Sequence, residues 1–372
     1  MKKVKLGDVC DILDSQRIPI TASERKKGMY PYYGANGIQD YVDGYIFDDE
    51  LVLLAEDGGN FGSKDKPIAY RVSGKCWVNN HAHVLKAKPG VDIDYLCYSL
   101  MFYDVTSLVN GATRQKLTQA DMRKMEIPLP SLEEQKAIAG KLDKVSGLIE
   151  KRKTQLEKLD LLIKSRFIEM FGDPVINSKG WETAPLSRLI IAANNGLARR
   201  GKDEDGSIVL RLVELQNGFI DYSAPNRIKL TEAEQKRYKL IDNDFLFARV
   251  NGNPDYVGRC AVFNEIEEPV YHNDHIIRVH FDENKINGCF TSVLLNSDYG
   301  KRQLKEQIKT SAGQYTISQD GIGAIITIIP PLQFQRQFAV FVEQVDKSKF
   351  EIQKSLEKLE ILKKSLMQQY FG

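Results

Sequence analysis

The sequence lacks the features that mark secreted and membrane-spanning proteins. None of its apolar runs approaches the roughly 20 residues that a membrane-spanning helix requires. The N-terminal segment, residues 1–8, is basic, but no apolar stretch with a small-residue cleavage site follows it. We therefore expect no membrane partner, no secretion and a cytoplasmic location.

Cysteine is scarce, and its spacing excludes the usual disulfide and zinc frameworks. The chain has five cysteines, an odd number, and no Cys-x-x-Cys pair, as expected for reduced thiols. His81-x-His83 together with Cys76 or Cys97 lacks the paired ligand spacing of structural zinc sites. We expect no bound metal.

Catalytic signatures are missing as well. No Walker-type phosphate-binding loop occurs. Residues 253–256, Asn-Pro-Asp-Tyr, resemble the Asn-Pro-Pro-Tyr motif of amino-methyltransferases, but Asp255 replaces the second proline and no glycine-rich cofactor turn accompanies it. Pro254-Asp255 followed by Glu265-Ile266-Glu267 lacks the lysine of a nuclease metal site. An ordinary turn is the simpler interpretation, so we expect no catalytic site and no bound cofactor.

The sequence also has no large excess of basic over acidic residues. The chain has 52 basic and 50 acidic residues, a net charge of +2, so evidence for a polyanionic partner must come from local patterns. The hydrophobic fraction of 42% and the charged fraction of 27% are usual for globular proteins. A length of 372 residues fits two or three domains.

An internal repeat organises the chain. Residues 117–172 align with residues 317–372 without a gap, at an offset of 200. The matches at the start of this segment pair Pro130, Leu132 and Gln135 with Pro330, Leu332 and Gln335, and those at its end pair Phe171-Gly172 with Phe371-Gly372. Such self-similarity predicts that each half of the chain is one structural unit.

A fainter repeat precedes the first one, at an offset of 193. It pairs Asp49, Leu53, Ala55, Gly59 and Asn60 with Asp242, Leu246, Ala248, Gly252 and Asn253. In the same register Ile68-Ala69-Tyr70 faces Ala261-Val262-Phe263, and Asn80 faces Asn273. The repeats predict a globular part at 1–130, a helix at 131–172, a second globular part at 173–330 and a second helix at 331–372.

The retained segments have the pattern of long helices. Ser131 and Glu134 have the spacing of a capping box, which predicts that the first helix starts there. Apolar residues then fall on the two seam positions of a heptad: Leu142, Val145, Ile149, Leu156, Leu159 and Ile163 in the first helix, and Val342, Val345, Ile352, Leu356, Leu359 and Leu366 in the second. Arg152, Lys349 and Lys363 interrupt the seam, which favours one register.

These helices are too long to pack only on their own globular parts, which is the simpler alternative. A helix of about 40 residues spans about 60 Å, more than the diameter of a small domain. Two single-seam helices in one chain bury their seams most easily against each other. We predict an α+β fold with two mixed α/β globular domains, joined and separated by two long antiparallel coiled-coil helices with pseudo-twofold symmetry.

Polar and aromatic loop residues of the first globular part are candidates for binding. Residues 30–37 combine tyrosines with flexible turn residues, and residues 57–64 form a glycine-rich loop that could approach a phosphate. Asparagine can bond two atoms of an adenine edge. The candidates are Tyr32, Tyr33, Asn36, Asn60, Lys64, Asn79, Asn80 and His81, with Arg114 and Gln115 near the helix junction. A hairpin turn and structurally satisfied histidines remain the alternatives.

The second globular part offers candidates at corresponding places. Arg199 and Arg200 concentrate positive charge in a loop, for which a solvated surface is the equal alternative. Arginine and asparagine have the paired donors and acceptors that suit guanine and adenine in the major groove. The further candidates are Arg249, Asn251, Asn253, Tyr256, Arg259, His272, Asn273 and His275, with Gln314 and Tyr315 near the second helix junction.

The combination of these features resembles one protein family. Tandem globular parts, a Pro-Leu-Pro-Ser-Leu-Glu-Glu-Gln helix start at 128–135 and an ending in Phe-Gly at 171–172 and 371–372 are similar to specificity subunits of Type I restriction-modification systems. The resemblance covers essentially the whole chain. The second helix start departs from the pattern, with Gln333-Phe334-Gln335 where Glu-Glu-Gln is common.

The resemblance implies a non-catalytic subunit in which two target-recognition domains read the two halves of an interrupted site in double-stranded DNA, while the helices set the gap. It also implies that the helices dock methyltransferase subunits, two of them, and that a restriction and translocase subunit joins the complex. S-adenosylmethionine, ATP and magnesium would then be bound by those partners. A coiled-coil scaffold that bridges proteins without DNA is the alternative from another class, and a free-standing enzyme is the third.

Overall fold

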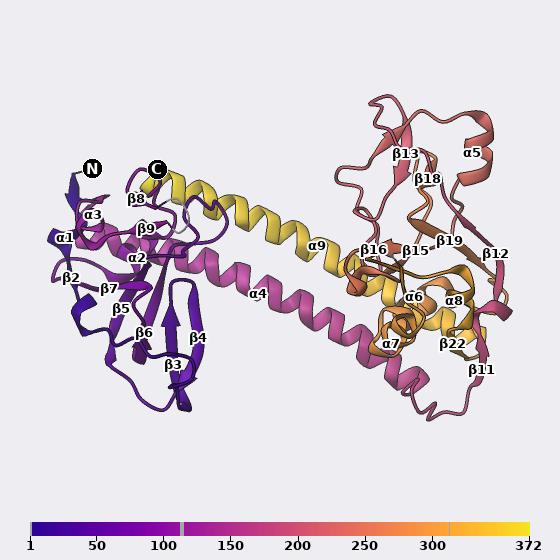
Figure 1. The fold of residues 1–372 in the computed structure, drawn as a ribbon, viewed down its shortest axis with the longest axis horizontal. Helices are drawn as coiled ribbons and strands as arrows, with labels where there is room; N and C mark the ends of the chain where they lie inside the picture. Colours follow the sequence, from indigo (N-terminus) through magenta and orange to yellow (C-terminus); the bar gives the residue numbers. More distant parts are fainter. Residues whose placement is uncertain (1, 112–114, 312) are drawn as a thin grey trace. The chain divides into compact units, whose positions relative to one another are not determined.

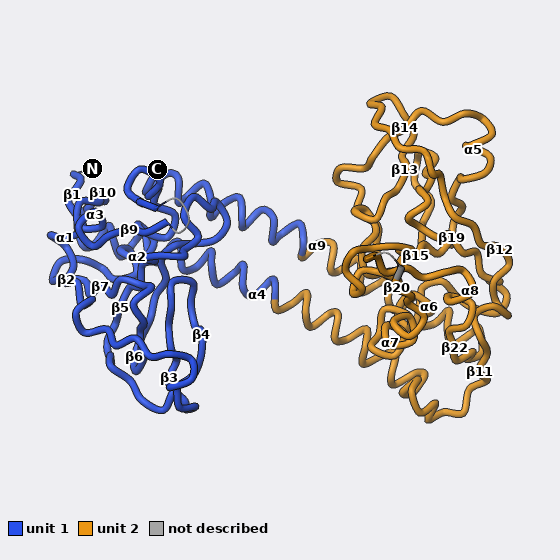
Figure 2. The backbone as a smooth tube through the Cα atoms, viewed as in Figure 1, with its two compact units in different colours: residues 1–153, 353–372 blue, residues 154–352 orange. Residues whose placement is uncertain are grey.

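The computed structural model describes residues 2–111, 115–311 and 313–372. The chain divides into two compact units, which Figure 2 shows in different colours: a first unit of residues 1–153 and 353–372, and a second unit of residues 154–352. Each unit contains strands, short helices and one part of each of the two long helices. The predicted α+β class is confirmed.

The first unit is built on a six-stranded sheet in the order β2-β7-β5-β6-β3-β4 (Figure 1). Its strands are β2 (Cys10–Ile12), β3 (Lys27–Gly34), β4 (Gly37–Val42), β5 (Phe47–Ala55), β6 (Ala69–Val78) and β7 (Ala82–Ala87). Around the sheet lie β1 (Lys3–Lys5), α1 (Leu6–Val9), η1 (Asp14–Gln16), α2 (Ile93–Met101), β8 (Val109–Asn110), β9 (Lys116–Leu117), α3 (Gln119–Met122) and β10 (Glu126–Pro128).

The central strand β5 shows why the sheet is buried on both faces. Successive side chains of a strand point to opposite faces. Leu51 and Leu53 accordingly join one core cluster, and Val52 and Leu54 join another that includes helix α2. All four side chains are completely buried. The unbroken apolar run of β5 therefore fixes the middle of the first unit.

The second unit spreads its strands over several smaller sheets. The largest has the order β12-β19-β15-β17, and three more pair β14-β13-β18, β16-β21-β20 and β11-β22. The strands are β11 (Glu182–Pro185), β12 (Ile190–Asn195), β13 (Ser207–Leu210), β14 (Arg227–Ile228), β15 (Phe245–Ala248), β16 (Val250–Asn251), β17 (Cys260–Val262), β18 (Val270–His272), β19 (Ile276–Phe281), β20 (Lys309–Ser311), β21 (Gln314–Thr316) and β22 (Ile326–Ile329). The short helices are η2 (Leu186–Arg188), α5 (Glu232–Tyr238), η3 (Pro254–Tyr256), α6 (Gly288–Asn296), α7 (Asp298–Glu306) and α8 (Gln319–Ala324).

Strand pairing corrects part of the fainter repeat. Leu54 pairs with Ala69 in the first unit, and Phe247, at the offset of 193, pairs with Cys260 in the second. Ala69 therefore corresponds to Cys260 and not to Val262, because the connecting loop is two residues shorter in the second unit. The repeat in this region is real, but the expected alignment of the β6 sequence with the β17 sequence is wrong by two residues.

The two long helices, α4 (Leu132–Phe171) and α9 (Leu332–Phe371), each have 40 residues. The capping box at the start of α4 is confirmed: the Ser131 amide donates to Glu134 Oε2 at 3.1 Å, and the Glu134 amide donates to Ser131 Oγ at 3.3 Å. Neither long helix, nor any other in the described part of the chain, carries an apolar stretch suited to spanning a membrane.

A buried glutamine attaches the start of each long helix to its globular part. In the first unit, Gln135 accepts from the Asp92 amide at 2.9 Å and donates to the carbonyls of Gly90 and Pro130 at 3.2 and 3.0 Å. In the second unit, Gln335 accepts from the Asn287 amide at 2.8 Å and donates to the carbonyls of Lys285 and Pro330 at 3.3 and 2.7 Å. The repeat therefore preserves one three-bond junction in both units.

Within each unit the long helices pack antiparallel, because the start of one lies beside the end of the other. In the first unit, Ile138 and Leu142 of α4 pack in a cluster with Leu366 and Phe371 of α9. In the second unit, Phe167 and Phe171 of α4 pack with Phe338 and Val342 of α9. The twelve predicted seam residues are buried or half-buried. Lys153 pairs with Glu360, and Lys349 with Asp160, across the helix pair.

Candidate functional site

Each unit contains a loop cluster made from the same parts. The loop after the central strand pairs with the segment before a short helix: Asp57 bridges Lys116 in the first unit, and Val250 pairs with Thr316 in the second. The first residue of that short helix is a glutamine, whose side chain bonds a residue on another segment of the same unit. Gln119 Nε2 donates to Asp14 Oδ2 at 3.0 Å, and Gln319 Nε2 donates to Asn195 Oδ1 at 3.3 Å. Predicted binding residues lie next to both loop clusters: His81 contacts Asp57 in the first unit, and Arg249 and Asn251 flank Val250 in the second.

In the first unit this place is filled by a charge cluster of Asp14, Arg17, Glu56, His83 and Lys116. Arg17 Nη1 donates to Glu56 Oε2 at 2.6 Å, and Lys116 Nζ lies 2.9 Å from Glu56 Oε1. His83 Nδ1 lies 2.6 Å from Asp14 Oδ2, and its Nε2 lies 2.9 Å from the Leu117 carbonyl oxygen. The centre of the charge cluster is closed to solvent, because Asp14, Glu56 and His83 are at most 8% exposed.

Hydrogen bonds and cations hold both carboxylates of the charge cluster in the charged form. Burial acts to raise the pKa of Asp14, but the hydrogen bonds from His83, Gln119 and the Val84 amide and the charge of His83 together outweigh burial, so the pKa is lowered. Burial likewise opposes ionisation of Glu56, whose pKa is lowered by hydrogen bonds from Lys116 and Arg17. Asp14, Glu56 and His83 lie close enough to share a cation, but Arg17 and Lys116 already neutralise this cluster.

The second unit has a hollow of about 390 Å³ at the corresponding place. Its polar lining consists of Asn195, Arg249, Lys309, Thr316, Ser318, Gln319 and Asp320. Arg249 is half-buried, and its Nη1 donates to the Asp274 carbonyl at 3.1 Å, which directs the guanidinium. The hollow therefore presents two cations, one carboxylate and several neutral polar groups to solvent.

Four predicted binding residues are buried, and their assignment as direct contacts is corrected. Tyr32 is 1% exposed, and its hydroxyl lies 3.3 Å from the Ile20 carbonyl oxygen. His272 is completely buried, and burial lowers its pKa to about 4, so it is a neutral core residue. Asn79 and Asn273 are 3% and 5% exposed and have the structural role described next.

Asn79 and Asn273 shape the same turn in the two units. Asn79 Oδ1 accepts from the His81 amide at 2.8 Å, and Asn273 Oδ1 accepts from the His275 amide at 3.2 Å. An asparagine side chain that bonds the amide two residues on stabilises an Asx turn. The predicted match of Asn80 with Asn273 is therefore shifted by one residue, and Asn79 is the true equivalent.

The remaining candidates of the first unit lie at its surface. Asn36 donates to the Gly58 carbonyl at 3.0 Å, and His81 Nδ1 lies 2.8 Å from Asp57 Oδ1. Tyr33 is half-buried, with its ring centroid 5.8 Å from that of Tyr70. The half-buried or exposed candidates also include Asn60, Lys64, Asn80 and Gln115. Arg114 lies outside the described residues.

Two candidate arginines of the second unit, Arg199 and Arg200, are exposed but already paired. Arg199 contacts Glu234 at 3.0 Å. Arg200 Nη1 lies 2.7 Å from Asp274 Oδ1, and its Nη2 lies 3.0 Å from His275 Nε2. Pairing with protein carboxylates fixes these guanidinium groups but leaves them accessible, since their side chains are 46% and 55% exposed.

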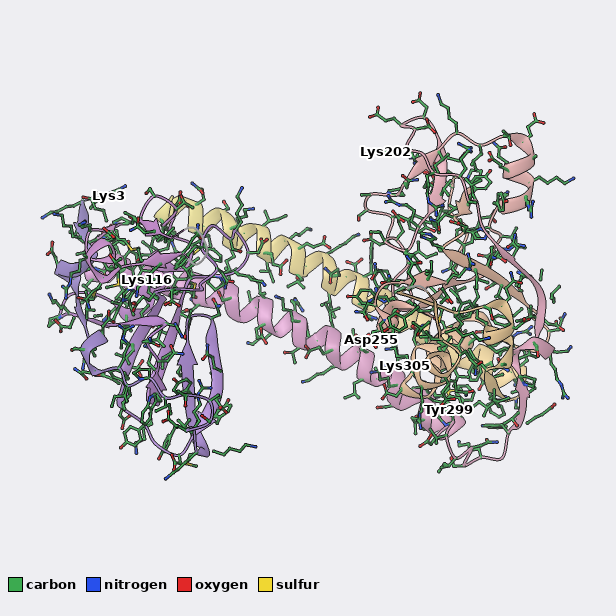
Figure 3. The ribbon with its side chains drawn as sticks, viewed as in Figure 1. Lys3, Lys116, Lys202, Asp255, Tyr299 and Lys305 are labelled. Carbon is green, nitrogen blue, oxygen red and sulfur yellow. The ribbon has the colours of Figure 1, made fainter. Side chains whose placement is uncertain are left out.

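The loop after β15 combines turn-forming and exposed side chains. Asn251 Oδ1 accepts from the Asn253 amide at 2.9 Å, and Asn253 Oδ1 accepts from the Asp255 amide at 3.0 Å. The Arg259 guanidinium stacks 3.9 Å above the Tyr256 ring centroid. Figure 3 shows Asp255 close to Lys305, with which it forms an ion pair of 3.1 Å. On the adjacent hairpin, Gln314 is exposed and Tyr315 is half-buried.

Sequence reasoning missed several residues of the two loop clusters. Lys309 and Asn195 line the hollow, and Arg17 completes the charge cluster, but none of them lies in a predicted loop motif. Gln119 and Gln319 stand in the aligned segment as Leu-Thr-Gln and Ile-Ser-Gln. Their match in the repeat was the available signal for a shared role.

Comparisons with known proteins agree on one family. The model of the Type I restriction modification DNA specificity domain matches residues 1–159 and 202–363. The StySPI type I specificity subunit of Salmonella potsdam is 29% identical over 313 residues, which cover 80% of this chain and 67% of that protein. The MjaVIII specificity subunit of Methanocaldococcus jannaschii is 24% identical over 396 residues, which cover 98% of this chain and 90% of that protein.

A solved structure shows the same fold. The crystal structure of the S subunit of a Type-I restriction-modification system from M. genitalium superposes with a TM-score of 0.66 at 17% identity, covering 100% of this chain and 96% of that one. A chain from a structure of a type I R-M system, described for its complex assembly, gives a TM-score of 0.53 at 15% identity.

Proposed function

This chain belongs to the Type I restriction modification DNA specificity family, and we propose that its two units each read one half of an interrupted site in double-stranded DNA. It is a specificity subunit, which works with DNA and with other subunits of a restriction-modification complex and carries no catalytic step itself. The proposal concerns how this subunit divides the reading between its units.

The observation that carries the proposal is that the same loop cluster is built twice. In each unit the loop after the central strand pairs with the segment before a short helix. Exposed amide or arginine side chains lie in neighbouring loops of both units, among them Asn36 and Asn80 in the first unit and Asn253 and Arg200 in the second. Such side chains read base edges in the major groove, each good pair contributing about 1 to 3 kcal/mol of discrimination. Two equivalent clusters therefore suit two half-sites.

We assign the gap between the half-sites to the long helices. Each helix starts on one unit and ends packed against buried residues of the other, so the two units share both helices. Two rigidly linked readers must match half-sites at a fixed spacing along the duplex. The number of heptads in α4 and α9 would then set the length of the non-read DNA.

The helices also offer equivalent surfaces for two partner subunits. Leu161 and Leu162 of α4 are 61% and 45% exposed, and their repeat partners Ile361 and Leu362 of α9 are 69% and 45% exposed. Isolated exposed apolar side chains are common, but a pair that recurs at the repeat offset suits two copies of one partner. We assign these surfaces to two methyltransferase subunits, with a restriction and translocase subunit joining the complex. S-adenosylmethionine, ATP and magnesium would bind to those subunits, in the cytoplasm.

The test is to sequence methylated bases in cells that express this chain with its neighbouring methyltransferase. We expect methylation at a two-part motif with a constant gap. Replacing residues 1–130 with the corresponding part of another specificity subunit should change one half of the motif and leave the other half and the gap intact. An unchanged motif, or a change in both halves, would contradict the assignment of one half-site to each unit.

A second experiment separates the proposal from the alternative of a DNA-free scaffold. Electrostatic contacts with phosphates make DNA affinity fall steeply with salt. The full chain with its methyltransferase should therefore bind duplex DNA in a salt-dependent manner. A complex that assembles but binds no DNA would favour the scaffold.

A further inference from the structure

The hollow of the second unit stands where the first unit has its charge cluster. Ala55 pairs with Ala82 in the first unit, and Ala248 pairs with Ile276 in the second. The residues that follow these pairs correspond, so Arg249 replaces Glu56 and Ile277 replaces His83. The glutamine bonds place Asn195 opposite Asp14 in the same way. The second unit has thus exchanged two carboxylates and an imidazole for an arginine, an amide and an apolar side chain.

This exchange opens the hollow and changes its charge. Ile277 and Ile317, which are 1% and 2% exposed, lie beneath the polar lining. Arg249 and Lys309 contribute two positive charges, whereas Asp320 contributes one negative charge. Arg249 is held by the Asp274 carbonyl, which cannot neutralise it, and Lys309 is exposed. The hollow therefore has an excess of positive charge that is not cancelled inside the described lining.

We propose that the hollow receives a phosphate of the DNA backbone, bound by Arg249 and Lys309 with help from the second proton of the Gln319 side-chain amide. The inference rests on the proposed function and adds that the second unit has a backbone-anchoring site that the first unit lacks. The site holds the DNA strand in position and does not read its sequence.

The shape and chemistry of the hollow favour a phosphate over a base. Side chains that read bases must project into a groove, whereas recessed cations can meet only a group that projects from the duplex. An extrahelical base is usually stacked between aromatic or apolar side chains. None of the described residues that line the hollow is aromatic. Arginine and lysine are the common partners of phosphate groups.

The test measures DNA binding by the full chain in complex with its methyltransferase subunit, at several salt concentrations. The probes are a duplex of mixed sequence and a duplex that carries the methylated motif. We expect Lys309→Gln and Arg249→Gln each to weaken binding to both duplexes roughly tenfold and to lower the salt slope by about one. Thermal melting confirms that each variant is folded, and the exposed Lys309 is the variant least able to disturb folding.

Lys305→Gln is the matched control, since it removes the same charge from an exposed lysine of the same unit that pairs with Asp255 and does not line the hollow. Figure 3 shows Lys305 beside Asp255. If both hollow variants behave like Lys305→Gln, the anchoring site is refuted. A loss confined to one base pair of the motif would show base reading and would also overturn the inference, with the proposed function intact. If the unmodified complex binds no DNA, the proposed function itself fails.

A chemical probe sharpens the result. Single phosphates of the duplex are replaced, one at a time, by uncharged methylphosphonates. We expect one position at which the replacement weakens binding of the unmodified complex but has no further effect on Lys309→Gln. Additive losses at every position would show that Lys309 meets no particular phosphate, which would overturn the proposal.

Discussion

The two units keep the same attachments and differ in what they enclose. Gln135 and Gln335 make the same three hydrogen bonds, and Asn79 and Asn273 shape the same turn. Between these fixed points the first unit encloses a charge cluster, whereas the second leaves a hollow. The comparison teaches that duplication preserved the junctions with the helices, while the loop clusters were free to diverge.

The largest expected effect concerns the ends of the long helices. Phe171 is completely buried in the second unit, whereas its counterpart Phe371 is only half-buried in the first. Because truncation of a buried phenylalanine costs about 3 to 5 kcal/mol, we expect Phe171→Ala to lower the free energy of unfolding by about 4 kcal/mol and Phe371→Ala by about 2 kcal/mol. Denaturant unfolding measures both, with Phe350→Ala, at a side chain 58% exposed, as the control. Equal losses at Phe171 and Phe371 would show that the two helix ends are equally packed.

A somewhat smaller effect tests whether the glutamine junctions are equivalent. Gln135→Leu and Gln335→Leu each leave one amide and two carbonyls without a partner. Because an unsatisfied buried polar group costs about 1 to 3 kcal/mol, we expect each variant to lose about 3 kcal/mol in chemical denaturation. The exposed Gln369→Leu should lose almost nothing. A loss at only one of the two junctions would mean that the repeat preserves the residue without its function.

Acid should destabilise the second unit before the first. Burial lowers the pKa of His272 from 6.5 to about 4, so its neutral form is favoured in the folded chain. The unfolded chain binds a proton below pH 6.5 and the folded chain does not, so stability falls as the pH drops from 6.5 towards 4. We expect a loss of about 2 kcal/mol between pH 6.5 and pH 5, since each pH unit contributes about 1.4 kcal/mol.

The variant His272→Gln isolates this contribution, because glutamine can still donate to the Tyr238 carbonyl but does not titrate. Between pH 6.5 and pH 5 the unmodified chain should therefore lose about 2 kcal/mol more unfolding free energy than this variant. In the first unit, the pKa values of Asp14 and Glu56 are lowered from their ordinary values of 3.8 and 4.5. The stability that these carboxylates contribute is therefore lost only when the pH falls below about those ordinary values. Parallel pH profiles for the variant and the unmodified chain would contradict the assignment to His272.

The smallest effect concerns the charged residues in the seam. Lys363 in the first unit is half-buried, and burial together with the nearby Lys153 lowers its pKa. Lys349 in the second unit instead contacts Asp160 at 2.8 Å. We expect Lys363→Leu to stabilise the chain by about 1 kcal/mol, because it removes a desolvated charge and adds apolar contact. Lys349→Leu should give no such gain, and the exposed Lys364→Leu serves as the control in thermal melting.

The sequence predicted the repeated framework because the framework depends on local patterns. The capping box at Ser131 and Glu134 and the gapless alignment through Gln135 and Phe171 are visible without a structure. The loop residues were harder to assign. Asparagine can either stabilise a buried Asx turn or read a base from an exposed position. The residue type at Asn79 and Asn273 therefore did not indicate that these side chains are buried.

The hollow could not be predicted, since its residues meet only through tertiary pairing. Arg249 and Lys309 are far apart in the sequence, and strands β16, β21 and β20 bring their segments together. The position of Asn195 depends on the pairing of β12 with β19. The offset of 193 already aligned Arg249 with Glu56, but a connection that is one residue longer in the second unit hid the correspondence of Ile277 with His83.

The crossing of the helices between the units has a consequence for the order of folding. Tyr95 and Tyr98 of the first unit are covered in part by Leu366 and Phe371, which are synthesised only after the whole of the second globular part. The first globular part is thus completed only after the second has been translated. Until the final turns of α9 arrive, a newly made chain exposes an aromatic surface at its N-terminal half, and a truncated product that ends before residue 353 keeps that surface open.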